Sequence, residues 1–207
     1  MMELLKQTRT IGVKASYVLF DSWFSFPMII KKVHDQGIPV ICMLKSMPKV
    51  RYGYQEQKPT LDQLYQTVRK KRGRAKIVAS VIVSLGENEK GEDVQAKIVF
   101  VRNRRQKKQW LALLTTDLEL SDEETVRIYG KRWDIEVFFK MIKSYLGLAK
   151  EFQGRSYDRM VAHTSIVYTR YLLLAIESRE ACDPRTLGNL FYLCCDELED
   201  LKFATAL

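Results

Sequence analysis

Four residues between positions 129 and 143 have side chains suited to chemistry on a charged substrate: Tyr129, Arg132, Glu136 and Lys143. On an α-helix their spacing places all four within an arc of about 60°, and Lys140 falls beside them. Such a face can offer the Glu136 carboxylate to a metal ion while the neighbouring cations hold phosphate groups. A solvated charged face, stabilised by pairs such as Glu136 with Lys140, fits the same spacing. Geometry alone leaves both interpretations open.

One long helix over residues 121–148 is predicted to position these side chains. Ser121 followed by Glu124 is a capping box, and the acidic residues between them suit the positive end of the helix dipole. The apolar residues of this segment should form a separate stripe toward the core: Ile128, Ile135, Phe139, Ile142 and Leu146. Two further helices are predicted over residues 157–180 and 186–203, so the chain after residue 120 is expected to be α-helical.

Strand and helix signals alternate before residue 120, which predicts an α/β fold. Apolar runs at residues 16–21 and 38–44 flank a helix over residues 27–36, which Pro27 begins and Gly37 ends. Two strands joined by one helix should be parallel neighbours. A short helix capped by Thr60 is predicted over residues 60–71. Strands over residues 77–85, 94–102 and 109–115 follow it, and we interpret them as an antiparallel insertion into the α/β unit.

Positive charge is concentrated in the first 120 residues, which hold 22 basic and 11 acidic side chains. Two clusters account for it, at residues 69–76 and 102–108, and they include Arg72, Arg74, Arg104 and Arg105. Such clusters suit a polyphosphate partner, because each neutralised phosphate releases condensed counterions. A well-solvated surface would have the same composition, so charge alone does not decide between them.

Composition excludes several classes of protein. The 207 residues have a net charge of +9 and are 46% hydrophobic, which is typical of a globular chain with a sizeable core. No apolar run approaches the roughly 18 residues that a membrane span requires. The four cysteines form no C-x-x-C pair and only two histidines are present, so neither a zinc site nor a disulfide framework is predicted.

The pattern Tyr129-x2-Arg132-x3-Glu136-x6-Lys143 resembles a known signature. It matches the Y-x2-R-x3-E-x6-K motif of bacterial insertion-sequence transposases of the DDE class, in the insertion-sequence-four family, without a gap or substitution. The residues around Glu136 are also similar to the sequence around that family's catalytic Glu. The block from Val18 to Phe24 resembles the surroundings of its second catalytic Asp. The resemblance extends over nearly the whole chain, and it favours a functional charged face over a merely solvated one.

The resemblance implies a fold as well as a motif. It implies an α/β fold made of a partial ribonuclease-H-like core, an antiparallel β insertion before the catalytic helix, and an α-helical C-terminal region. Residues 1–207 would form a single catalytic-domain fragment. Its parts would be a core βαβ segment (1–48), a basic β-rich insertion (49–118) and a helical part with the catalytic Glu (119–207).

The resemblance also implies roles for individual residues. Three carboxylates of this family hold two Mg²⁺ ions, which Mn²⁺ can replace, so Asp21 and Glu136 would be catalytic metal ligands. The other implied positions bind DNA: Tyr129, Arg132 and Lys143 at phosphates, Trp133 stacking on an unpaired base, and Lys140, Arg72, Arg74, Arg104 and Arg105. The partner would be double-stranded DNA, both the transposon terminal repeats and the target. The full-length protein would act as a homodimer, away from membranes, in the bacterial cytoplasm at the nucleoid.

One departure from the family pattern changes what this chain is expected to do. The family's first catalytic Asp precedes the second on an earlier strand, but no Asp precedes Asp21 here and Glu3 is the only acid there. We therefore expect a C-terminal portion of a transposase that lacks the leading strands of the core, exposes a strand edge and is inactive alone. A non-catalytic nucleic-acid-binding remnant and a related metal-dependent nuclease are the alternatives.

Overall fold

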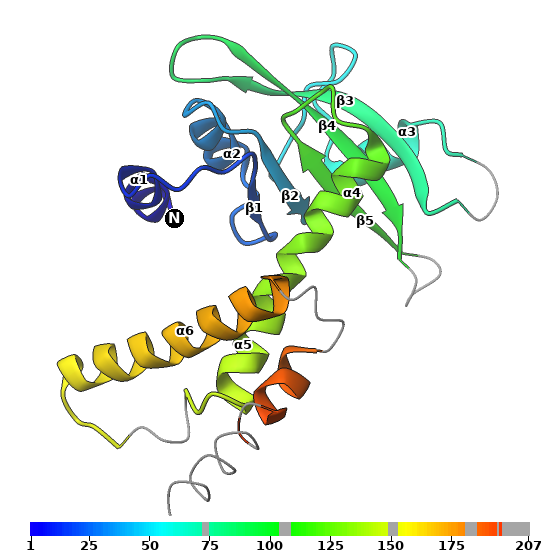
Figure 1. Cartoon of the computed structure of the whole chain (residues 1–207). Helices are drawn as coiled ribbons and strands as arrows, with labels where there is room; N and C mark the ends of the chain where they lie inside the picture. The colour runs from blue at the N-terminus through cyan, green and yellow to red at the C-terminus, as the bar shows by residue number, and fades with distance from the viewer. Residues whose placement is uncertain (72–74, 104–108, 149–152, 181–185, 194, 196–207) are drawn as a thin grey trace, which may run out of the picture. The chain divides into compact units, whose positions relative to one another are not determined.

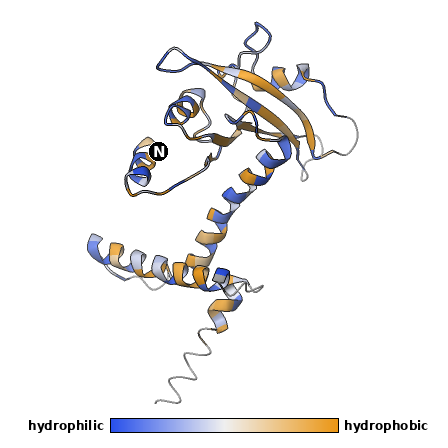
Figure 2. Cartoon of the chain, turned by 45° about the horizontal axis from the view of Figure 1, so that its top comes forward, coloured by the Kyte–Doolittle hydropathy of each residue, from blue (hydrophilic) through white to orange (hydrophobic). Residues whose placement is uncertain are grey.

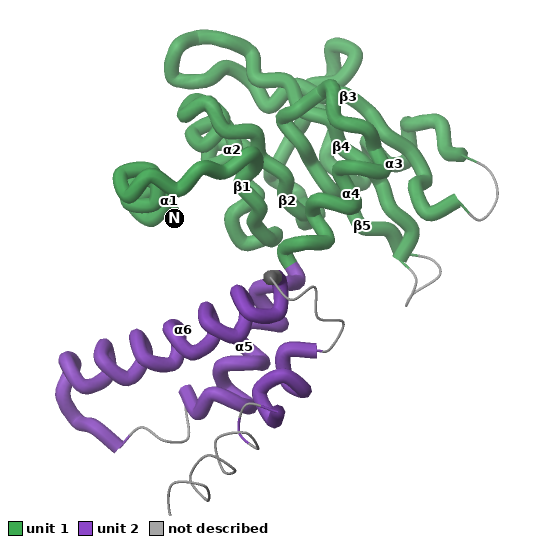
Figure 3. Tube along the Cα trace, viewed as in Figure 1, with its two compact units in different colours: residues 1–132 green, residues 133–207 purple. Residues whose placement is uncertain are grey.

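The computed structural model describes residues 1–71, 75–103, 109–148, 153–180, 186–193 and 195. The chain divides into two compact units, Met1–Arg132 and Trp133–Leu207, which Figure 3 distinguishes by colour. Four of the predicted cations, Arg72, Arg74, Arg104 and Arg105, lie outside the described residues.

A single five-stranded sheet is the framework of the first unit. Its strands are β1 (Val18–Phe20), β2 (Val40–Leu44), β3 (Ile77–Glu87), β4 (Asp93–Arg102) and β5 (Trp110–Thr115). They lie in the order β1-β2-β5-β4-β3 (Figure 1). β1 and β2 are parallel, as predicted, and the other neighbours are antiparallel. The three later strands therefore extend the same sheet from β2, which makes the fold mixed α/β.

Local turn and capping signals explain the helix that joins the parallel strands. α2 (Pro27–His34) begins at Pro27, whose missing N–H needs no partner at the first helical position. The chain reverses after it at Gly37, where φ is +78° and a side chain would be strained. α1 (Met2–Thr10) was not predicted, and its Met2 and Leu5 pack against the main core.

Sequence correctly predicts the start of α3 (Leu61–Thr67) but not its end. Thr60 and Gln63 form a reciprocal capping box at the first turn. The helix ends four residues before position 71, because Val68 is extended and the Lys71 N–H donates to the Val78 carbonyl at 2.7 Å. A tertiary hydrogen bond to the neighbouring strand thus replaces the last helical turn.

The two faces of the sheet pack against different helices. Strand residues such as Cys42, Phe100 and Leu114 are buried against α2 and α3. Their neighbours Met43, Val99 and Leu113 face the other way, where side chains of α4 (Asp122–Gly130) cover them. Figure 2 shows that hydrophobic residues predominate along the strands. This alternation follows from the two-residue period of a strand and decides which side chains can meet α4.

The helix predicted over residues 121–148 is not continuous. α4 ends at Gly130, a 3₁₀ helix η1 (Lys131–Trp133) follows, and α5 (Asp134–Ser144) then resumes α-helical geometry. Gly130 weakens the α-helix at this point because glycine loses the most backbone freedom on ordering. A 3₁₀ turn rotates more per residue than an α-helix, so the single 60° arc does not apply across residues 131–133.

The second unit contains α5 and α6 (Tyr157–Glu180), the latter with the predicted bounds. Its core includes Ile142, Leu146 and Val167. The predicted apolar stripe is wrong at two positions, because Ile135 and Phe139 are 49% and 41% exposed. Residues 187–193 are helical, and most of the remainder of the predicted third helix lies outside the described residues. None of the helices in the described ranges is both long and apolar enough to cross a membrane.

A partly buried lysine fastens the start of α4 to the sheet. The Lys97 ammonium on β4 donates to the carbonyls of Leu118, at 3.2 Å, and Leu120, and it lies 4.0 Å from the Asp122 carboxylate. The Lys97 and Asp122 side chains are 13% and 16% exposed. Because solvent screens such contacts weakly, they should contribute measurably to stability.

Substitution of Lys97 by Met should lower the free energy of unfolding by about 2 kcal/mol, because two carbonyls and one carboxylate lose a charged partner. Urea denaturation followed by circular dichroism measures the change. Lys90→Met is the matched control, since Lys90 is exposed in the β3–β4 turn and should matter by less than about 0.5 kcal/mol. Equal midpoints for both variants would show that this contact does not stabilise the fold.

Candidate functional site

Asp21 directly follows β1, at the end of the sheet where both parallel strands finish. Its side chain is half-buried, and its Oδ1 accepts a hydrogen bond from the Trp23 N–H at 2.9 Å. Phe20 packs in the core shared with α2 and α3. Since side chains alternate across a strand, Asp21 belongs to the opposite face, the one that α4 covers. The register of β1 and β2 ends with Phe20 beside Cys42, so Asp21 and Met43 are the next residues of the two segments.

Tyr129 and Arg132 reach the same region from α4 and η1. Tyr129 packs with Met43 against the cluster of Val99 and Leu113. Burial raises the pKa of the Tyr129 phenol, the Arg132 guanidinium lowers it in part, and the Asp21 carboxylate raises it further. The Arg132 guanidinium carbon lies 5.9 Å from the centre of the Tyr129 ring. The first unit thus brings a carboxylate, a phenol and a guanidinium into one neighbourhood.

The remaining signature residues lie on the second unit. Glu136, Lys140 and Lys143 are exposed on α5, and their spacing of four and three residues places them on one face of that regular helix. The Lys143 ammonium lies 5.6 Å from the centre of the Phe139 ring. Trp133, the first residue of this unit, is 63% exposed, as a residue that stacks on an unpaired base would need to be.

Described members of the basic clusters lie at the same end of the sheet as Asp21. β3 begins after Lys76, and β4 ends at Arg102, whose N–H donates to the Lys76 carbonyl at 2.8 Å. The antiparallel registers from β2 through β5 to β4 place Arg102 at the end of the sheet where β1 and β2 finish. With about 4.8 Å between neighbouring strands, Asp21 and these cations are spread over about 20 Å across this end of the sheet.

Carboxylate oxygens are the ligands that Mg²⁺ prefers, so Asp21 and Glu136 are of the right kind for this ion. Within the described ranges no three His, Cys, Asp or Glu side chains form a group that could hold a metal ion. Asp117 belongs to the opposite end of the sheet, where its Oδ2 accepts from the Tyr17 hydroxyl at 2.8 Å and raises the pKa of Tyr17. Asp117 is therefore a structural partner of Tyr17.

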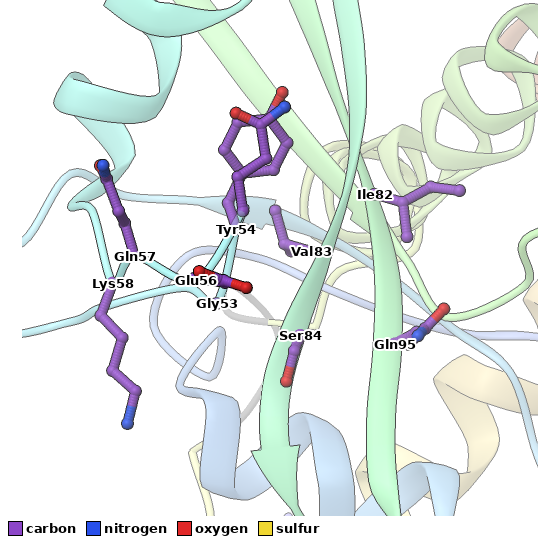
Figure 4. Close-up of a pocket in the computed structure, with 10 residues that line it drawn as sticks. Gly53, Tyr54, Glu56, Gln57, Lys58, Ile82, Val83, Ser84 and Gln95 are labelled. Atoms are coloured by element: carbon purple, nitrogen blue, oxygen red, sulfur yellow. The ribbon is translucent and has the colours of Figure 1, made fainter.

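Two pockets contain residues that sequence analysis did not select. One, of about 530 Å³, is lined by residues 53–58 and by Ile82, Val83, Ser84 and Gln95 of the adjacent strands (Figure 4). None of the predicted site residues lines it. The other, of about 240 Å³, is lined by Ser22, Trp23, Phe26, Lys45 and Met47, directly after Asp21 and after β2. The aromatic run that follows Asp21 is the sequence signal that could have indicated this second pocket.

Comparison with known proteins identifies the family. No curated protein matches the chain. A family model described as the transposase DDE domain matches residues 1–173, which is most of the sequence. The match includes Asp21 and all four residues of the signature. The chain therefore belongs to the transposase DDE domain family, whose members carry out DNA transposition by metal-dependent cleavage of DNA.

Proposed function

We propose that this chain supplies Asp21 and Glu136 as two of the three catalytic carboxylates of an insertion-sequence transposase of the insertion-sequence-four family. The observation that supports this most directly is the shared neighbourhood of Asp21, Tyr129 and Arg132 in the first unit. Asp21 is more than 100 positions from Tyr129 and Arg132 in the sequence. Their proximity is expected if the block around Asp21 and the start of the signature serve a single site.

The proposed reaction has two phosphoryl-transfer steps, one at a phosphodiester of the transposon end and one at a phosphodiester of the target DNA. Water first cleaves the strand at the transposon end, and the freed 3′-hydroxyl then attacks a phosphodiester of the target DNA. When bound, two Mg²⁺ ions activate the attacking oxygen and stabilise the departing one. Asp21 and Glu136 would hold these ions, and the core around β1 and β2 would be ribonuclease-H-like. Manganese would substitute for magnesium, since both accept oxygen ligands.

Cations of the chain would hold the DNA in register for this step. Arg132 offers a planar, always charged fork that suits a phosphate near Asp21. Tyr129 would orient Arg132 through its ring, and Lys143 and Lys140 would contact further phosphates of the terminal repeat. The described cations Lys76 and Arg102, at the same end of the sheet, would contact the backbone beyond it. The complete protein would act as a homodimer on paired ends at the bacterial nucleoid.

The proposal is tested with the 207-residue chain, alone and with any in-frame upstream sequence restored. Both are incubated with duplexes that end in the repeats of the surrounding element, with Mg²⁺ or with EDTA. We expect the 207-residue chain to bind the ends without cutting them, because it contains two of the three carboxylates, and the restored protein to cut and join. Absence of end binding by both proteins would overturn the proposal, and metal-dependent cutting without joining would favour a nuclease. Binding alone by both would favour a remnant that has lost chemistry.

Substitution of Arg132 by Ala should weaken binding of terminal DNA about tenfold and reduce the salt slope of log K by about one unit, because one phosphate contact is lost. Fluorescence anisotropy at several KCl concentrations, in EDTA, measures both quantities. Arg127→Ala, on the preceding helix α4, is the matched control, since Arg127 is paired with Glu124. If the two variants bind alike, Arg132 is not a phosphate ligand.

A further inference from the structure

The pocket of about 240 Å³ next to Asp21 is formed by the segments that directly follow β1 and β2. Trp23 and Phe26 follow β1, and Lys45 and Met47 follow β2. In α/β sheets, ligands bind outside the carboxyl ends of the strands. β1 and β2 are the parallel pair in this sheet (Figure 1). The pocket therefore lies outside the carboxyl ends of the parallel pair.

Aromatic surface is unusually accessible at this pocket. The Trp23 side chain is 80% exposed and Phe26 is 41% exposed. The backbone that presents them is nevertheless fixed. The Trp23 N–H donates to Asp21 at 2.9 Å, and the hydroxyl of the fully buried Ser25 donates to the Ser22 carbonyl at 3.1 Å. Two large rings held outward beside a cavity indicate a binding surface, since folding alone would bury them.

The chemistry of the lining selects one kind of ligand. The volume of about 240 Å³ is below the roughly 300 Å³ at which pockets for drug-sized molecules begin, so one planar ring system suits it better than a larger molecule. Trp23 and Phe26 offer ring faces, on which any nucleobase can stack. Lys45 is exposed and adds one positive charge at the rim. A flat apolar ring joined to a phosphate matches both features.

We propose that this pocket binds an unpaired nucleobase of a DNA strand whose neighbouring phosphate lies at Asp21. Trp23 stacks on the base, Phe26 closes the cavity, and the Lys45 ammonium contacts the adjoining phosphate. The site rests on the proposed function for the position of the strand, but it is distinct from the signature residues and from Trp133. A peptide side chain is the competing occupant; the single cation of the lining and the cationic edge of the same sheet end favour DNA.

The test compares two DNA probes on the whole 207-residue chain in EDTA, where no cleavage occurs. One probe is a blunt duplex, and the other has three unpaired nucleotides at its end with 2-aminopurine among them. We expect the parent chain to prefer the unpaired end by about tenfold and to quench the 2-aminopurine, as stacking on an indole does. Trp23→Ala should lose both the preference and the quenching. Trp23→Phe should retain most of both, and Lys45→Gln should lower the salt slope by about one unit.

Phe24→Ala is the matched control, because Phe24 is 43% exposed beside Trp23 but does not line the pocket. It should bind both probes as the parent does, and melting curves should be unchanged for all four variants. If Trp23→Ala still prefers the unpaired end, or if it loses affinity for both probes equally, the proposed base site is wrong. Neither result would touch the transposase proposal, which depends on metal-dependent cutting by the restored protein.

Discussion

Replacement of Glu136 by Gln, in the protein with its in-frame upstream sequence restored, should reduce DNA cleavage and strand transfer by about 10³-fold or more. A neutral amide oxygen is a poor replacement for a carboxylate at Mg²⁺, and the loss falls on the transition state for phosphoryl transfer. DNA affinity should stay equal or rise slightly, since a negative charge among the cations of α5 is removed. Gel assays of cleaved and joined products, with anisotropy for binding, separate the two effects.

Asp134→Asn is the matched control for this experiment. Asp134 is also an exposed acid in the first turn of α5, two residues before Glu136, but it lies outside the signature. We expect it to cut DNA within about threefold of the parent, because only the helix dipole and the surface charge change. Equal activity of Glu136→Gln and the parent would remove Glu136 from the metal site, whatever the DNA affinity.

Truncation of Phe100 to Ala should lower the free energy of unfolding of the first unit by about 4 kcal/mol. Phe100 is fully buried on β4, and its ring centre lies 5.1 Å from that of Tyr65 and 5.2 Å from that of Trp110. It therefore joins α3 to two strands, and its loss leaves a cavity and breaks two aromatic contacts. Typical domains are stable by only about 5–15 kcal/mol, so the variant should lose a large fraction of the stability of this unit.

Tyr52→Phe is the comparison for Phe100→Ala, because it hardly changes the side-chain volume in the same core. The Tyr52 side chain is 1% exposed, and its buried hydroxyl has no hydrogen-bond partner among the residues that the structure describes. Burial raises the pKa of Tyr52. Removing that hydroxyl should leave stability unchanged or raise it by about 1 kcal/mol. Guanidinium denaturation followed by circular dichroism gives both values. A Phe100→Ala midpoint as high as that of Tyr52→Phe would show that the aromatic cluster is not a stability centre.

Elements with local signals could be predicted from sequence. Pro27, Gly37 and Thr60 mark helix ends through their own backbone preferences, and the structure places those ends accordingly. The break at η1 was missed because the periodicity of charged and apolar residues continues across it, while the cause is the low helix propensity of Gly130. α3 was predicted too long because its end depends on the hydrogen bond from Lys71 to the strand β3.

For the candidate site, the sequence selects residue types, but their grouping depends on the fold. The signature spacing selected the positively charged and acidic candidates, and the block from Val18 to Phe24 selected Asp21. That Asp21 and Tyr129 belong to one face of the sheet depends on the register of β1 with β2 and on the packing of α4 over Met43. Such long-range relations have no local sequence signal, and the Trp23 pocket depends on the same two strands.

β1 is an edge strand of the sheet, and this has a practical consequence for the isolated protein. This strand has three residues, and β2 is its strand partner among the described residues. A terminal strand presents backbone donors and acceptors to any other chain that can extend alongside it. Concentrated preparations should therefore self-associate through Val18–Phe20, and recovery of soluble material should improve at low protein concentration. Because Asp21 directly follows this strand, such aggregates would also cover the carboxylate, so inactivity of a concentrated sample would reflect association as well as chemistry.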